Sequence, residues 1–166
     1  MADDALLTLA AELGIALQAR GWKLALAESC TGGMAAQYVT AIPGSSAWFE
    51  RGFVTYSNEA KLELLGVSPE TLKLHGAVSE QTAREMALGA LNHSHAQVVA
   101  AITGIAGPDG GSKEKPVGTV WFCWAGPGGL LKSEIRQLSG SREAIRRKAV
   151  ETALEGAIQL TLAPDL

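Results

Sequence analysis

Val98-Val99-Ala100-Ala101-Ile102 is a continuous apolar run, and the glycine-rich stretch TGIAGPDGGS at 103–112 follows it directly. Such a run predicts a central β-strand that is covered on both faces. Leu24-Ala25-Leu26-Ala27 repeats the arrangement, because ESCTGG at 28–33 comes straight after it. Loops that follow parallel strands emerge at the carboxyl edge of an α/β sheet, where such folds bind ligands. The two strand–loop pairs therefore predict an α/β fold with a ligand site at that edge.

Periodicity and capping residues predict the remaining elements. Helices are expected over about 4–20, over 34–40, around Lys61 with Asn58 as cap, after Ser68 and Ser79, and from Ser141 to about 160. A short helix is also expected from Ser45, and strands over 53–56, 117–124 and 130–138. This order predicts one domain over residues 1–166, a three-layer α/β/α sandwich around a mixed sheet.

Composition limits the function classes. The formal net charge is −3 and no basic run is present, which argues against a nucleic-acid binder. No apolar stretch has the length of a membrane span, and the acidic N-terminus lacks the basic flank of a secretory signal. Two cysteines are too few for a disulfide framework, so we expect a cytoplasmic location. The charged fraction of 19% is somewhat low, which suggests buried surface between subunits and hence a homo-oligomer.

The first glycine-rich loop has the form of a phosphate cradle. Hydroxyl groups at Ser29 and Thr31 and free N–H groups at a helix start suit an anion. The loop lacks the spacing and the lysine of the nucleoside-triphosphate and dinucleotide motifs. An ordinary helix cap with a tight turn explains it equally well. Cys30 is either a thiol nucleophile or a small buried side chain, and we favour the second because no histidine lies near it in the chain.

Two serines and a lysine carry the reactive chemistry that the sequence offers. Ser45 and Ser46 lie where a turn becomes a short helix, so backbone amides beside either hydroxyl are placed to hold an oxyanion. A serine nucleophile needs a base, and Lys61 and Tyr56 are better placed than the histidines, which lie in or beside helices. A lysine acts as a base once desolvation has lowered its pKa. The alternative is that Lys61 is a solvated side chain on a helix face.

The second glycine-rich loop carries four glycines, more than a turn needs, which favours close approach of the backbone to a ligand. Asp109 in this loop fits either a contact to a ribose hydroxyl or an Asx-turn, and we favour the turn. Taken without further information, these features leave two classes open. One is an enzyme for a small phosphorylated molecule, and the other is a non-catalytic nucleotide-binding or regulatory module.

Five motifs together resemble the CinA C-terminal-domain family: AESCTGG at 27–33, GSS at 44–46, YSNEAK at 56–61, HGAVS at 75–79 and TGIAGP at 103–108. The resemblance covers nearly the whole chain in order, and it is closest to the free-standing nicotinamide-nucleotide amidohydrolases of the family. It implies hydrolysis of the carboxamide of nicotinamide mononucleotide to nicotinate mononucleotide and ammonia. It further implies a serine mechanism in pyridine nucleotide recycling, with no metal and no cofactor.

The resemblance also implies roles for individual residues. Ser46 matches the proposed nucleophile, Lys61 the base and Tyr56 its hydroxyl partner, although the choice between Ser46 and Ser45 depends on the alignment. The positions associated with binding of the small-molecule substrate are Ser29, Thr31, Gly32, Gly33, Ser45, Thr103, Gly104 and Arg142.

Overall fold

A five-stranded mixed sheet forms the centre of the computed structural model, which describes residues 2–164 and the side chains of residues 5–164. The strand order is β2–β1–β3–β4–β5, with β1 parallel to β2 and β3, and with β4 antiparallel to β3 and β5. The strands are β1 Leu24–Glu28, β2 Phe49–Val54, β3 Val98–Gly104, β4 Thr119–Ala125 and β5 Leu131–Gln137.

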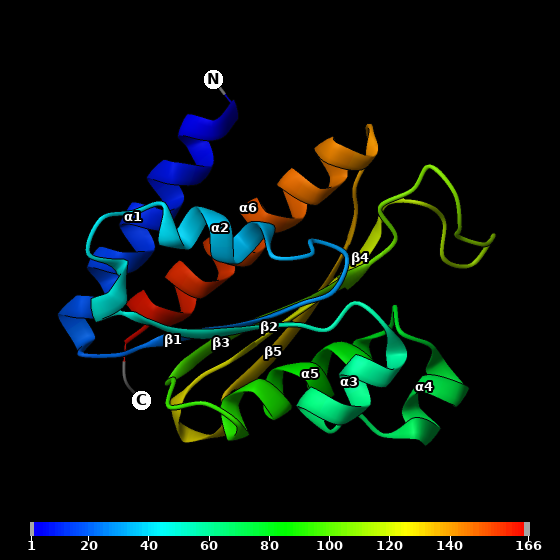
Figure 1. The fold of residues 1–166 in the computed structure, drawn as a ribbon, viewed down its shortest axis with the longest axis horizontal. Coiled ribbons are helices and arrows are strands. Elements are labelled where there is room, and N and C mark those ends of the chain that lie inside the picture. The colour runs from blue at the N-terminus through cyan, green and yellow to red at the C-terminus, as the bar shows by residue number, and fades with distance from the viewer. Residues whose placement is uncertain (1, 165–166) are drawn as a thin grey trace.

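Helices cover both faces of this sheet (Figure 1). One face carries α1 Ala2–Arg20, α2 Met34–Thr40 and α6 Arg142–Leu162, and the other carries α3 Asn58–Leu65, α4 Pro69–His75 and α5 Glu80–Asn92. Two short 3₁₀ turns, η1 Ser45–Ala47 and η2 Pro127–Gly129, complete the elements. The predicted three-layer sandwich around a mixed sheet is confirmed.

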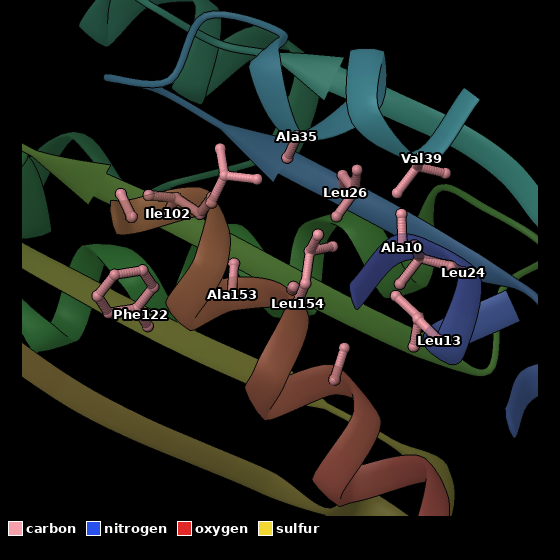
Figure 2. Close-up of a cluster of buried hydrophobic side chains, with 14 of the residues drawn as sticks. Ala10, Leu13, Leu24, Leu26, Ala35, Val39, Ile102, Phe122, Ala153 and Leu154 are labelled. Carbon is pink, nitrogen blue, oxygen red and sulfur yellow. The ribbon is translucent and has the colours of Figure 1, made fainter. Parts of the chain in front are cut away.

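The core lies in two layers, one on each side of the sheet. Successive residues of a strand point to opposite faces, so Leu24 and Leu26 of β1 enter one layer while Ala25 and Ala27 enter the other. Figure 2 shows the larger layer, in which β1 leucines meet side chains of α1, α2 and α6. Every residue of β1 is buried, as the continuous apolar run predicts for a strand covered on both faces.

Small residues on the second face bring α5 close to its neighbours. Gly89 of α5 lies against the end of α3, where a Cβ would stand 2.0 Å from the carbonyl oxygen of Leu65. No side chain fits at this point, so the glycine fixes how closely α3 and α5 approach. The contact also positions Lys61, which lies on α3.

The element boundaries differ from the predicted ones mainly around β2. This strand covers residues 49–54 rather than 53–56, so Tyr56 lies in the loop beyond it. Ser57, rather than Asn58, caps α3, since its side chain accepts a hydrogen bond from the amide of Ala60. Within the described part of the chain, no helix combines the length and the apolar character needed to cross a membrane.

Candidate active site

The carboxyl ends of the three parallel strands meet at one edge of the sheet and surround a pocket of about 170 Å³. The start of α6 reaches the same edge, because β5 ends there and α6 follows it. The pocket is lined by Ser29, Cys30, Tyr56, Asn58, Lys61, Ala77, Val78, Thr103, Gly104, Ala106 and Arg142. The predicted ligand edge of the sheet therefore does contain a polar pocket.

Lys61 and Ser29 form the central pair of this pocket. The Nζ atom of Lys61 lies 2.9 Å from Oγ of Ser29, which directly follows β1. Lys61 is only 1% exposed, so the interpretation as a solvated lysine is wrong. Nζ also lies 2.9 Å from the carbonyl oxygen of Thr55 and 3.3 Å from that of Tyr56. The loop after β2 thus holds the amine against the serine that follows β1.

The surroundings of Nζ favour loss of its charge. Burial lowers the pKa of Lys61 below its ordinary value because the charged form loses its hydration. A neutral amine has two N–H bonds and one lone pair. In the structure Nζ donates to Oγ of Ser29 and to the carbonyl oxygens of Thr55 and Tyr56, so loss of one proton leaves a lone pair that faces the Ser29 hydroxyl. A deprotonated Lys61 in this position is within reach of the Ser29 proton.

The first glycine-rich loop is held by a carboxylate of the chain itself. Glu28, only 1% exposed, accepts the hydroxyl of Thr31 at 2.6 Å and the backbone amide of Ala35 at 2.9 Å. It also accepts the amides of Gly33 and Ala36, at 3.2 and 3.0 Å. The anion at the start of α2 is therefore Glu28, and the amides that the sequence analysis expected to be free for a phosphate are occupied.

Tyr56 and Arg142 meet on one side of the pocket. Tyr56 is 62% exposed, and its hydroxyl accepts a hydrogen bond from Nη2 of Arg142 at 3.1 Å. Nη1 of Arg142 donates to the carbonyl of Gly107 at 2.6 Å. Tyr56 therefore contacts Lys61 through its carbonyl, whereas its hydroxyl is paired with Arg142. This differs from the expected role of a hydroxyl partner for the base.

Ser45 and Ser46 lie at the opposite side of the sheet from the pocket, where the parallel strands begin. They precede β2, whose first residue Phe49 pairs with Leu24 at the amino end of β1. Ser29 follows the carboxyl end of the same strand, so the five residues of β1, roughly 16 Å, separate the two sites. Ser45 is buried, Ser46 is exposed, and neither lines the pocket. The structure brings Lys61 to Ser29 and not to the predicted nucleophile.

The second glycine-rich loop contributes Thr103 and Gly104 to the pocket, as expected. The Thr103 hydroxyl donates to the carbonyl of Ala77 at 2.8 Å and so ties β3 to the segment before α5. Gly104 is required for packing, since a Cβ there would lie 2.6 Å from the side chain of Val120. Close packing against β4, rather than contact with a ligand, therefore explains why this residue is a glycine.

Three further residues that were predicted to bind the substrate lie outside the pocket. Thr31, Gly32 and Gly33 belong to the Glu28 network and its turn and do not line the pocket. Four lining residues had no predicted role in binding or catalysis: Asn58, Ala77, Val78 and Ala106. All four lie in the quoted motifs, but only Asn58 has a polar side chain that could have marked it as a binding residue.

Cys30 lines the pocket but is unsuited to be the nucleophile. Burial raises the pKa of its thiol to about 11, and the thiolate is the reactive form of cysteine. The thiol is thus protonated at neutral pH. The interpretation of Cys30 as a small buried side chain agrees with this environment.

Comparison with known proteins shows the family of this chain. A model of the CinA C-terminal domain matches residues 6–161. The chain is 56% identical to the nicotinamide-nucleotide amidohydrolase PncC of Enterobacter agglomerans, over 96% of this chain and 97% of that protein. It is also 56% identical to PncC of Escherichia coli strain K12, over 93% and 94% of the two chains.

A solved structure shows the same fold. The competence/damage inducible protein CihA from Agrobacterium tumefaciens superposes with a TM-score of 0.91 at 47% identity, over 94% of this chain and 95% of that one. The match in sequence and the match in fold both extend over nearly the whole chain, pocket included. This chain belongs to the CinA C-terminal domain family.

Proposed function

We propose that this protein hydrolyses the carboxamide of nicotinamide mononucleotide, with Ser29 as nucleophile and Lys61 as base. The observation that carries the proposal is the 2.9 Å contact between Lys61 Nζ and Ser29 Oγ in a pocket at the ligand-binding edge of the sheet. Relatives that are 56% identical over nearly their full length are named nicotinamide-nucleotide amidohydrolases, which supports the substrate and the reaction. The pair replaces Ser46 as the centre of the reaction.

The reaction begins with transfer of the Ser29 hydroxyl proton to the neutral amine of Lys61. Ser29 Oγ forms a bond to the carboxamide carbon, and the carbonyl oxygen becomes an oxyanion. The Lys61 ammonium then gives its proton to the amide nitrogen, and ammonia leaves. Water attacks the resulting ester with Lys61 as base, which releases nicotinate mononucleotide and restores the serine. Each proton that Lys61 takes is returned, so the cycle balances.

The oxyanion needs backbone donors beside the nucleophile. Ser29 lies on the turn between β1 and α2, so the amide of Cys30 is the residue-after-nucleophile donor that such turns supply. Glu28 holds this turn in place through its contacts with the Thr31 hydroxyl and the first amides of α2. In this account, the glycine-rich loop serves to hold Ser29 in place rather than to bind the phosphate.

The direct test is incubation of the purified protein with nicotinamide mononucleotide. We expect stoichiometric ammonia and nicotinate mononucleotide, measured by a coupled ammonia assay and by chromatography. Binding of the nucleotide without ammonia release would instead support the non-catalytic nucleotide-binding module. The expected cytoplasmic location and homo-oligomer stay predictions.

Replacement of Cys30 separates the serine mechanism from a thiol mechanism. We expect Cys30→Ala to retain activity within about threefold, because the protonated thiol takes no part in the reaction and loses only packing contacts. Alkylating reagents should likewise leave the wild-type rate unchanged. Loss of turnover both in Cys30→Ala and in the alkylated wild-type protein would indicate that Cys30 is the nucleophile.

Replacement of Glu28 tests whether the buried carboxylate positions Ser29. Glu28→Gln exchanges one acceptor oxygen for an NH₂ group that faces the donors of the loop. We expect kcat for nicotinamide mononucleotide to fall about 10- to 100-fold, since a small misplacement of a nucleophile has effects of this order. KM should change little, because Glu28 does not line the pocket. Steady-state kinetics give both constants.

Glu85 provides a matched control for this experiment. Its carboxylate accepts the amide of Ser68 at 2.8 Å and the hydroxyl of Thr71 at 2.5 Å at the start of α4. Glu85→Gln therefore removes a comparable helix-start network, worth about 1–3 kcal/mol, outside the pocket. We expect both variants to lose thermal stability and only Glu28→Gln to lose kcat. Equal kinetic effects in the two variants would contradict the positioning role.

A further inference from the structure

A second hollow adjoins the catalytic pocket and contains a lysine that the mechanism does not use. The pocket around Ser29, at about 170 Å³, is smaller than the roughly 300–1,000 Å³ of sites that enclose a whole ligand of drug size. It therefore accommodates the reacting end of a nucleotide and leaves the rest outside. The neighbouring hollow, of about 270 Å³, shares Val78 with the pocket as a common wall.

The positive charge of Lys115, which lies on the loop between β3 and β4, faces this hollow. Figure 1 shows this loop extending from the sheet at the same end of the molecule as α4 and the start of α6. Nζ of Lys115 donates to the carbonyl of His75 at 2.5 Å, and a Cβ on Gly76 would lie only 3.3 Å from it. The ammonium is thus fixed directly over the backbone that leads into the catalytic pocket.

The other groups in the hollow suit a phosphate with an attached sugar. The His75 imidazole adds a nitrogen donor, and Trp121 supplies an aromatic wall. Glu80 also lines the hollow; its carboxylate accepts the hydroxyl of Ser133 and lies 4.0 Å from Arg84, which offsets part of its negative charge.

We propose that this hollow is the subsite for the phosphate-bearing end of the substrate, with Lys115 as the residue that binds the phosphate. The proposal rests on the proposed function, because it places the carboxamide at Ser29 and lets the nucleotide pass Val78. Lys115 then acts on affinity for the phosphate and not on the chemistry. Substrates without a phosphate gain nothing from it.

The test compares nicotinamide mononucleotide with nicotinamide riboside, which lacks the phosphate. We expect Lys115→Gln to lower kcat/KM for the mononucleotide about 10- to 100-fold through KM, the effect of losing one charged hydrogen bond. The value for the riboside should stay within about twofold of wild type. Lys113→Gln is the matched control, because Lys113 lies two residues away, is exposed and lines neither cavity. It should leave both substrates unaffected.

Product binding gives a readout that does not need turnover. Calorimetric titration should show weaker binding of nicotinate mononucleotide to Lys115→Gln than to wild type or Lys113→Gln. Equal losses for the mononucleotide and the riboside, or equal effects of the two lysine variants, would overturn the subsite. An inactive wild-type protein that still shows the Lys115-dependent affinity would overturn the proposed hydrolysis and retain the subsite.

Discussion

Ser29→Ala is expected to reduce kcat for nicotinamide mononucleotide by at least about 10³-fold, or roughly 4 kcal/mol of barrier. The change removes the protein atom that attacks the carboxamide carbon in the proposed mechanism. The alanine keeps the backbone of the turn, and Lys61 keeps its contacts with the carbonyls of Thr55 and Tyr56. Substrate affinity should therefore remain close to wild type. Steady-state ammonia release measures kcat, and calorimetry measures affinity.

Ser46→Ala is the control for this experiment. Ser46 is exposed at the opposite edge of the sheet, so its replacement should leave kcat within about twofold of wild type. The two variants together decide between the position indicated by the family resemblance and the position indicated by geometry. A loss of turnover in Ser46→Ala with an active Ser29→Ala would restore the original assignment and refute ours.

Lys61→Met is expected to lower kcat about 10²- to 10⁴-fold, the usual range for loss of a general base. Methionine has a similar length and fills the buried site, but it cannot accept the proton of Ser29. Lys61→Arg should also be slow, because arginine stays protonated at working pH. Thermal melting of each variant shows whether the fold is retained.

The pH dependence of the wild-type protein carries the signature of the same group. Lys61 acts as a base only when it is unprotonated, so kcat/KM should rise with pH through its pKa and level off above it. Burial lowers the pKa of Lys61 from its ordinary value of 10.5, so the midpoint should lie below that value. If the wild-type profile lacked this rise, or if Lys61→Met showed the same profile, Lys61 would not be the base.

The sequence was sufficient to predict the fold because hydrophobic patterning decides it. The run at 98–102 and the shorter run at 24–27 became the buried strands β3 and β1, and both glycine-rich loops follow them. Lys61 was also identified, but its burial depends on contacts of Nζ with the segments that follow β1 and β2. These contacts form only in the folded protein, so the sequence alone left the solvated alternative open.

The preference for Ser29 over Ser46 as nucleophile rests on geometry that the motifs do not show. Ser46 precedes β2 and Ser29 follows β1, and these two strands are parallel, so the two serines lie at opposite ends of the strands. Family resemblance gave both residues a role and did not use this rule. The role of Glu28 was missed because its four donors, from Thr31 to Ala36, become neighbours only when the turn has formed.

The arrangement of the substrate in the pocket tests the central claim most directly. A crystal structure of Ser29→Ala with nicotinamide mononucleotide would show where the unreacted carboxamide lies. We predict its carbon about 3–3.5 Å from the position of the missing hydroxyl oxygen, with its nitrogen within reach of Lys61. A carboxamide bound beside Ser46, at the far edge of the sheet, would contradict the Ser29–Lys61 mechanism.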